Sequence, residues 1–153
     1  MNPIVRSATS TDIPELARLD AHTFGSSAYS LSTVRQLLDV FGGLVVLSQD
    51  ADGVPRGYAF GALAAGAETS WILALGVERS HRRQGFGRAT ADALLGRVGA
   101  LGAERVRLTC APEARASRAF WTSLGFVEVE HVADYLGPGR DRLVLERGFR
   151  SRG

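Results

Sequence analysis

The chain has 153 residues, of which 45% are hydrophobic and 22% charged, and its net charge at neutral pH is +2. This length and composition fit one soluble domain, so we expect a single domain over residues 1–153. The charge is too small to indicate a nucleic-acid partner, and the apolar stretches are too short to span a membrane. A lone cysteine excludes an internal disulfide framework, and the N-terminus lacks a signal-peptide pattern. We therefore expect a cytoplasmic protein with no nucleic-acid or membrane partner.

The first forty residues predict a short strand followed by two helices. Ile4–Ser7 has strand character, and Thr11 is a candidate N-cap for a helix that ends near Gly25. Ser32 is a candidate N-cap for a second helix through Phe41. In both helices apolar residues recur at intervals of three and four, the spacing of an amphipathic helix. In the first helix these residues are Ile13, Leu16, Leu19 and Phe24.

The remaining residues predict six strands and two further helices. A turn at Asp50–Gly53 joins the first two strands into an antiparallel hairpin. Helices are expected over Ala91–Leu101 and Ala116–Leu124, and a glycine follows each of them. The chain therefore predicts a mixed α/β fold with one strand-helix-strand unit at its centre. The strands are expected at Leu44–Ser48, Arg56–Leu63, Ser70–Val77, Arg105–Cys110, Phe126–Val132 and Arg142–Glu146.

A glycine-rich segment, Val77–Arg88, joins a predicted strand to the following helix. Gly85 and Gly87 allow a tight turn that directs several backbone N–H groups to one point, where the helix dipole adds positive potential. This arrangement suits a pyrophosphate better than a neutral ligand, and the alternative is a simple turn with solvated arginines. The arginines of the segment are Arg79, Arg82, Arg83 and Arg88.

Two nucleotide-binding motifs are excluded for this segment. A dinucleotide-binding fingerprint requires a third glycine three residues after Gly87, where Thr90 stands. A Walker loop ends in Gly-Lys-Ser/Thr, and the chain contains no lysine. The segment therefore matches neither class of loop.

The segment Arg82-Arg83-Gln84-Gly85-Phe86-Gly87 resembles the Arg/Gln-x-x-Gly-x-Gly/Ala motif of the GNAT N-acetyltransferase superfamily. Ser117–Phe126 is similar to a second signature of that family, a helix that runs into Leu-Gly-Phe. The predicted order of elements also matches over nearly the whole chain. The resemblance implies the GNAT fold, a mixed and mostly antiparallel central sheet with a splayed parallel strand pair and flanking helices. It implies acetyl-CoA as cosubstrate and no metal.

The resemblance also implies which residues contact acetyl-CoA. Backbone groups of the predicted strand would meet the pantetheine arm and the acetyl carbonyl, with the Val77 N–H polarising the carbonyl oxygen. The glycine-rich loop would hold the pyrophosphate. The implied cofactor-binding residues are Leu75, Gly76, Val77, Arg82, Arg83, Gln84, Gly85, Phe86, Gly87, Arg88, Ser117 and Trp121.

The sequence departs from the family at two positions, one that affects the general acid and one that removes a hydrogen bond to the cofactor. Trp121 stands where many members carry a tyrosine, and Ala114 stands where an asparagine is often found. An indole cannot act as a general acid, so another group must protonate the leaving thiolate. We predict that Tyr135 does so, with Ser117 or water as the alternatives.

A general base or a water relay is needed because free alkyl amines have pKa values near ~10.4 and must lose a proton before attack. Glu68 and Glu78 flank the predicted strand Ser70–Val77, where the family often places a carboxylate. They are the candidate bases, and solvated strand-end charges are the alternative reading. Asp134 and Asp141 are weaker candidates.

These features together predict an N-acetyltransferase that acts on a primary amine, in a small molecule or at a protein N-terminus, by direct attack through a tetrahedral intermediate. Because the chain has no lysine, any lysine that it acetylates belongs to another molecule. The alternative is a non-catalytic or regulatory acyl-CoA-binding module, which the residues at 114 and 121 motivate, and a longer acyl-CoA donor is a third reading. Family members are often homodimers, although no pattern in these residues fixes an oligomeric state.

Overall fold

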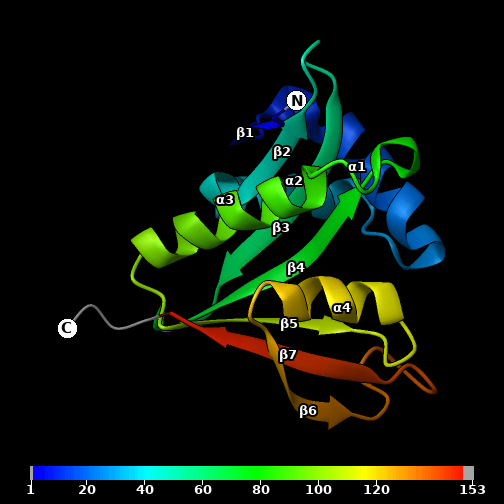
Figure 1. The fold of residues 1–153 in the computed structure, drawn as a ribbon, viewed down its shortest axis with the longest axis vertical. Helices are drawn as coiled ribbons and strands as arrows, with labels where there is room; N and C mark the ends of the chain where they lie inside the picture. The colour runs from blue at the N-terminus through cyan, green and yellow to red at the C-terminus, as the bar shows by residue number, and fades with distance from the viewer. Residues whose placement is uncertain (1, 150–153) are drawn as a thin grey trace. The chain divides into compact units, whose positions relative to one another are not determined.

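The computed structural model of the protein describes residues 2–149, which form seven strands and four helices (Figure 1). Their order along the chain is the order that the sequence predicts. Among these residues, no helix combines the length and the apolar character needed to cross a membrane. The helices are α1 (Ile13–Phe24), α2 (Leu31–Phe41), α3 (Phe86–Ala100) and α4 (Arg115–Ser123). The strands are β1 (Ile4–Ser7), β2 (Val45–Gln49), β3 (Pro55–Leu63), β4 (Thr69–Val77), β5 (Arg105–Cys110), β6 (Val127–Val132) and β7 (Arg142–Gly148).

The beginning of α1 differs from the prediction. Thr11 lies inside a 3₁₀ turn, Ser10–Asp12, and does not cap the helix. That turn is itself closed by a capping box in which the Thr9 backbone N–H donates to Asp12 Oδ2 at 2.8 Å. Asp12 also accepts two hydrogen bonds from the Arg6 guanidinium, at 2.7 and 2.8 Å. The capping hydrogen bonds therefore lie in the 3₁₀ turn that precedes α1, and not at the first residue of the helix.

The N-cap of α2 is Ser30, not the predicted Ser32. Its Oγ accepts the Thr33 backbone N–H at 3.2 Å. Both serines offer the same capping chemistry, so local sequence does not choose between them. The helix register, which buries Val34 and Leu38, makes the choice.

All seven strands belong to one sheet, in the order β1-β2-β3-β4-β5-β7-β6. The pairs β1–β2, β2–β3, β5–β7 and β7–β6 are antiparallel. β4 and β5 are parallel, and they pair only where Thr69–Trp71 lies opposite Arg105–Arg107. The sheet confirms the predicted fold class, a mostly antiparallel sheet with one short parallel pair.

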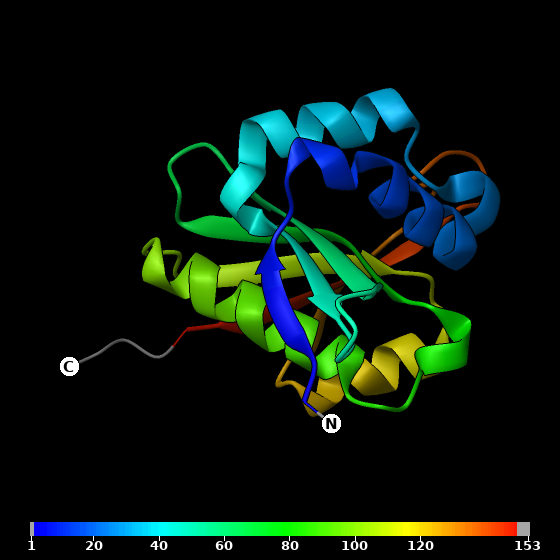
Figure 2. The same ribbon diagram turned by 90° about the horizontal axis from the view of Figure 1, so that it is seen from above.

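Contacts within the chain define two compact units. The first contains the described part of residues 1–62 together with residues 72–101, and the second contains residues 63–71 with the described part of residues 102–153. In the first unit, α1 and α2 cover one face of β1, β2 and β3, and α3 covers the other face (Figure 2).

Small residues of β3 allow α3 to pack closely against the first unit's strands. A Cβ atom on Gly61 would lie 2.8 Å from Leu94 Cδ1, and one on Gly57 would lie 3.2 Å from Thr90 Oγ1. Both distances are too short for an ordinary contact, so the helix lies where only glycine leaves room for it. This packing positions α3 and, with it, the loop that precedes the helix.

The opposite face of β3 carries large aromatic residues that form the core beneath α1 and α2. Tyr58 and Phe60 are fully buried there with apolar residues of both helices, among them Leu16 and Leu19. Phe24 was predicted to share this apolar face, but it is 38% exposed. Asp20, a polar residue, occupies a fully buried position of α1 instead.

The second unit is built on alternating residues of β5 and β7. Val106, Leu108 and Cys110 are buried, and the residues between them are only partly buried. β7 lies between β5 and the edge strand β6, with which it forms a hairpin (Figure 1). The residues of β6 before Val132 are all exposed, so side chains on both faces of this edge strand meet solvent.

Candidate functional site

The glycine-rich loop between β4 and α3 has a defined backbone conformation. Arg79–His81 forms a 3₁₀ turn whose last N–H donates to the Glu78 carbonyl oxygen at 2.9 Å, and Gln84 Nε2 donates to a carbonyl of this turn at 3.4 Å. Arg83 and Gly85 then adopt positive φ values of 61° and 89°. At position 85 this left-handed conformation explains the glycine, which alone adopts it without steric cost.

The N-terminus of α3 is uncapped by side chains of the part of the chain that the structure describes. Gly85 is the N-cap, and the first intrahelical bond runs from the Ala89 N–H to the Gly85 carbonyl oxygen at 3.0 Å. The N–H groups of Phe86, Gly87 and Arg88 therefore have no acceptor within the helix. Together with the helix dipole, these groups form a site for an anion such as a phosphate.

Thr90 fixes this end of α3 to the sheet. Its Oγ1 bonds to Ser48 Oγ of β2 at 2.8 Å and donates to the Phe86 carbonyl oxygen at 2.6 Å, and the residue is fully buried. The position that a dinucleotide-binding fingerprint reserves for glycine is therefore used here to anchor the helix.

Exposed arginines surround the uncapped helix end. Arg82, Arg83 and Arg88 are all exposed. Arg82 Nε donates to the Val77 carbonyl oxygen at 3.1 Å, and Arg88 makes a long ion pair with Asp92 at 3.8 Å. These guanidinium groups add positive charge to the helix dipole, so the electrostatics of the loop favour a polyanionic ligand.

The end of β4 that precedes the loop is tightly packed at one residue. Leu75, Gly76 and Val77 are the last residues of the strand, and Gly76 is buried. A Cβ atom on Gly76 would lie 2.2 Å from Thr23 Oγ1 and 2.6 Å from Tyr58 Cε1. Only glycine fits this position, and contacts from α1 and β3 therefore hold the strand backbone next to the loop.

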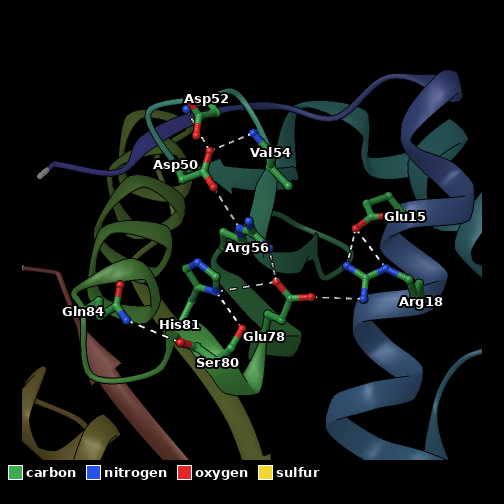
Figure 3. A network of polar contacts seen from close by, with 10 residues as sticks. All are labelled: Glu15, Arg18, Asp50, Asp52, Val54, Arg56, Glu78, Ser80, His81 and Gln84. Carbon is green, nitrogen blue, oxygen red and sulfur yellow. Dashed lines mark hydrogen bonds and ion pairs between the residues drawn. The ribbon is translucent and has the colours of Figure 1, made fainter.

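Glu78, a candidate base, lies at the centre of a polar network (Figure 3). One carboxylate oxygen pairs with Arg56 Nη1 at 2.5 Å, and the other pairs with Arg18 Nη1 at 3.2 Å. The hydrogen bond from Arg56 and the charges of both arginines lower the pKa of Glu78 despite its partial burial. The group is therefore ionised and doubly paired at neutral pH.

A second carboxyl group of the first unit, Asp20, is fully buried, and sequence reasoning missed it. It accepts hydrogen bonds from the Tyr58 hydroxyl at 2.5 Å and from the Tyr29 backbone N–H at 2.7 Å. No arginine or histidine among residues 2–149 forms an ion pair with it, and burial raises its pKa. Its spacing from Ile13 and Leu16 is the apolar spacing of the helix, which is the signal that marks it in the sequence.

Two predicted cofactor residues, Ser117 and Trp121, lie on α4 in the second unit. Trp121 is buried and makes edge-to-face contacts with Phe120 and Phe126, at centroid distances of 4.8 and 5.2 Å. Ala114 occupies the N-cap of α4 and supplies no side-chain hydrogen bond. Trp121 thus packs in an aromatic cluster, and the N-cap of α4 lacks a side-chain acceptor.

Tyr135, the predicted acid, lies in the turn between β6 and β7 and is 43% exposed. The adjacent Asp134 accepts the Gly139 N–H at 2.7 Å. Asp141 accepts the Asp134 N–H at 3.0 Å and pairs with His131 at 2.9 Å, and these contacts lower the pKa of Asp141. Hydrogen bonds within the β6–β7 turn therefore hold its backbone, and the Tyr135 side chain of this turn is accessible to solvent.

The single cysteine of the chain, Cys110, lies in the second unit. Cys110 is buried, and burial raises the pKa of its thiol, which is the opposite of nucleophile activation. Within residues 2–149, no cluster of three or more His, Cys, Asp or Glu side chains could hold a metal ion.

The two candidate bases stand at opposite ends of β4. Glu68 precedes the strand and is exposed, and Glu78 follows it. Glu68 belongs to the second unit and Glu78 to the first, and the assignment of either as the base stays a prediction.

The geometry of the loop and the order of the sheet agree with a match to a protein-family model. Residues 13–126 match the model of the acetyltransferase (GNAT) family. The chain belongs to this family, as the resemblance of its two motifs implies. No curated protein sequence matches the chain.

Several solved structures share the fold of the chain at low sequence identity. Ard1 from Thermoplasma volcanium is 21% identical, with a TM-score of 0.90 over 99% of this chain and 100% of the other. The ribosomal-protein-S18-alanine N-acetyltransferase from Escherichia coli is 18% identical, with a TM-score of 0.83 over 99% and 97%. A phosphinothricin acetyltransferase from Sinorhizobium meliloti in complex with acetyl-CoA is 19% identical, with a TM-score of 0.80 over 97% and 89%.

Proposed function

We propose that the protein transfers the acetyl group of acetyl-CoA to a primary amine, either in a small molecule or at a protein N-terminus. The observation that carries this proposal is the uncapped N-terminus of α3 with three exposed arginines beside it, directly after the Leu75–Val77 end of β4. The N–H groups and guanidiniums fit the pyrophosphate of CoA, and the strand end would present backbone groups to the acetyl arm. Similar structures include an alanine N-acetyltransferase and a phosphinothricin acetyltransferase, which supports keeping both acceptor classes.

The proposed reaction is direct attack of the neutral amine on the thioester carbonyl. The new C–N bond forms, the C–S bond breaks, and CoA leaves as a thiolate that takes up one proton, while the amine loses one. The Val77 N–H is the proposed donor to the carbonyl oxygen as negative charge develops on it. Tyr135, which carries an accessible phenol, is the proposed acid.

The first test compares binding of acetyl-CoA by the wild-type protein and by Gly85→Asp, using isothermal titration. The new carboxylate would lie at the anion site, so we expect affinity to fall by roughly 100-fold or more. Gly66→Asp is a matched control, because Gly66 has a similar φ of 90° and, as at Gly85, a Cβ atom added there would have no other atom within 4 Å. Wild-type affinity in Gly85→Asp would refute the assignment of the phosphate site.

The second test measures thiol release with a panel of amines and peptides, first for the wild-type protein and then for Tyr135→Phe. If the phenol is the acid, turnover falls by roughly 100-fold while the affinity for acetyl-CoA is unchanged. Unchanged turnover would exclude Tyr135 as the acid and leave Ser117 or water.

The second candidate function is a non-catalytic acyl-CoA-binding module. It is favoured by the packing of Trp121 between two aromatic rings and by the apolar N-cap Ala114, neither of which offers a proton. Binding of acetyl-CoA without thiol release across the whole amine panel, and also with propionyl- and succinyl-CoA, would support this alternative. Turnover of any amine would remove it.

A further inference from the structure

The Glu78 carboxylate joins three segments of the first unit at the point where the loop begins (Figure 3). Its oxygens pair with Arg56 Nη1 of β3 at 2.5 Å and with Arg18 Nη1 of α1 at 3.2 Å. His81 Nδ1, in the loop itself, lies 3.7 Å from the same oxygen that pairs with Arg56. One side chain therefore connects the start of the loop to a strand and to a helix.

Both arginines also pair with a second carboxylate. Arg56 Nε pairs with Asp50 Oδ2 at 2.9 Å, and Arg18 pairs with Glu15 on the preceding turn of α1. Asp50 is in turn fixed by two backbone N–H groups of the β2–β3 turn, at 2.9 and 3.0 Å. The side chains of Glu78 and Arg56 are only 21% and 23% exposed, so their contact is screened less than a surface ion pair.

The backbone and the far end of the loop are tied to the same place. The Glu78 N–H donates to the Arg56 carbonyl oxygen at 2.7 Å. The His81 ring packs edge-on against the ring of Phe86, the first residue of α3, with centroids 5.8 Å apart. Glu78, which precedes the loop, is thus connected through the His81 side chain to Phe86, which follows the loop.

The geometry points to Glu78 as a positioning residue whose carboxylate fixes the loop 79–85 so that the N-terminus of α3 meets the pyrophosphate of CoA. This inference rests on the proposed function and assigns Glu78 a different role from that of a base. Both carboxylate oxygens already face guanidinium groups, so an incoming ammonium group would have to displace one of them. A carboxylate stabilised in this way is also a weaker proton acceptor.

When Glu78 is replaced by glutamine, the change in charge and the change in geometry predict opposite effects on the affinity for CoA. The substitution removes one negative charge near the phosphate site, which by itself would strengthen CoA binding, most of all at low salt. It also opposes an amide N–H₂ to one of the two arginines, which would release the start of the loop. If positioning dominates, binding weakens, and it does so at low and high salt alike.

The test is isothermal titration of CoA against the wild-type protein, Glu78→Gln, Arg56→Gln and the double variant. We expect each single variant to bind CoA about tenfold more weakly, and the double variant to bind no more weakly than the worse single variant, because both break one contact. Arg56→Gln also tests the inference should Glu78→Gln fail to fold. Asp39→Asn is the control for charge, since it removes a carboxylate from the exposed Arg35–Asp39 pair of α2, and CoA affinity should not change.

A pH profile separates the positioning role from catalysis and from a merely structural role. With an amine that the wild-type protein acetylates, Glu78→Gln should raise KM for acetyl-CoA, keep kcat within about threefold, and leave the acid limb of the kcat profile in place. Equal or tighter CoA binding by Glu78→Gln overturns the inference, and so does loss of the acid limb with unchanged affinity. Failure of the wild-type protein to bind CoA would overturn the proposed function as well, so the two failures are distinguishable.

Discussion

Two carboxyl groups of the first unit, Asp20 and Glu78, are held by alternate residues of β3 in opposite electrostatic settings. Tyr58 donates to the fully buried Asp20, and Arg56 pairs with the partly exposed Glu78. Burial raises the pKa of Asp20, and the arginines lower the pKa of Glu78. The hydrogen-bond and ion-pair partners of a carboxyl group therefore decide the direction of its pKa shift.

The difference also separates stability from function. An ionised carboxyl group without a cationic partner costs stability when it is buried, so a charged Asp20 lowers the stability of the core. It instead fixes β3 and the α1–α2 connection next to Gly76 through neutral donors. Glu78 performs the corresponding task for the loop with charged donors.

Among the substitutions that test the packing around Asp20, Gly76→Ala is expected to change the free energy of unfolding most. The added methyl group would lie 2.2 Å from Thr23 Oγ1 and 2.6 Å from Tyr58 Cε1. We expect a loss of about 3 kcal/mol in the free energy of unfolding, measured with urea, because the buried Tyr58 has no space to move into. Gly96→Ala in α3 is the control, since its position is open, and it should stabilise the protein by about 0.5–1 kcal/mol. A Gly76→Ala variant as stable as the wild type would mean that Thr23 and Tyr58, the partner of Asp20, do not pack closely against Gly76.

A smaller effect is expected from Tyr58→Phe. It leaves the Asp20 carboxyl group with the Tyr29 N–H as its remaining protein donor in the cluster. We expect a loss of about 2 kcal/mol in the free energy of unfolding, since a buried acceptor loses its partner. In the Tyr58→Phe background, Asp20→Asn should recover part of the loss, because it removes the charge. Simple additivity of the two substitutions would contradict the coupling between the side chains.

The smallest effect is a pH dependence with opposite sign for the two groups. The pKa of Asp20 is raised in the folded protein, so its contribution to stability is present at low pH and is lost as pH rises above an ordinary aspartate pKa. The pKa of Glu78 is lowered, so its contribution is present at neutral pH and is lost as pH falls below an ordinary glutamate pKa. Relative to the wild type, Asp20→Asn should thus gain stability with rising pH, and Glu78→Gln should lose it.

Urea unfolding of the three proteins between about pH 2.5 and pH 7 measures these slopes, each of which is limited to about 1.4 kcal/mol per pH unit. Slopes of the same sign would show that the two carboxyl groups do not differ in the way that the structure indicates.

The sequence predicts the order of elements and the glycine-rich turn before α3 because both depend on local patterns. The helical spacing of Leu16 and Leu19 and the glycines at 85 and 87 are visible without any tertiary contact. The N-caps are less visible, because Ser30 and Ser32 have the same capping chemistry and the burial of α2 selects between them.

The surroundings of the candidate catalytic residues could not be predicted. Glu78 meets Arg18 and Arg56 across 60 and 22 residues of chain, and no spacing rule connects them. Asp20 could have been found, since it is a polar residue at an apolar position of α1, but its partner Tyr58 is 38 residues away. Pairings of this kind arise only when the strands and helices come together.

The glycine N-cap of α3 makes hydrogen exchange at the start of the helix a test of whether a phosphate binds there. Because Gly85 has no side chain, the amide hydrogens of Phe86, Gly87 and Arg88 exchange with solvent in the free protein more readily than those deeper in the helix. A phosphate bound there would take the place of the missing cap and would protect the start of the helix from exchange. If the protein binds CoA as proposed, protection of these three amide hydrogens would locate the phosphate.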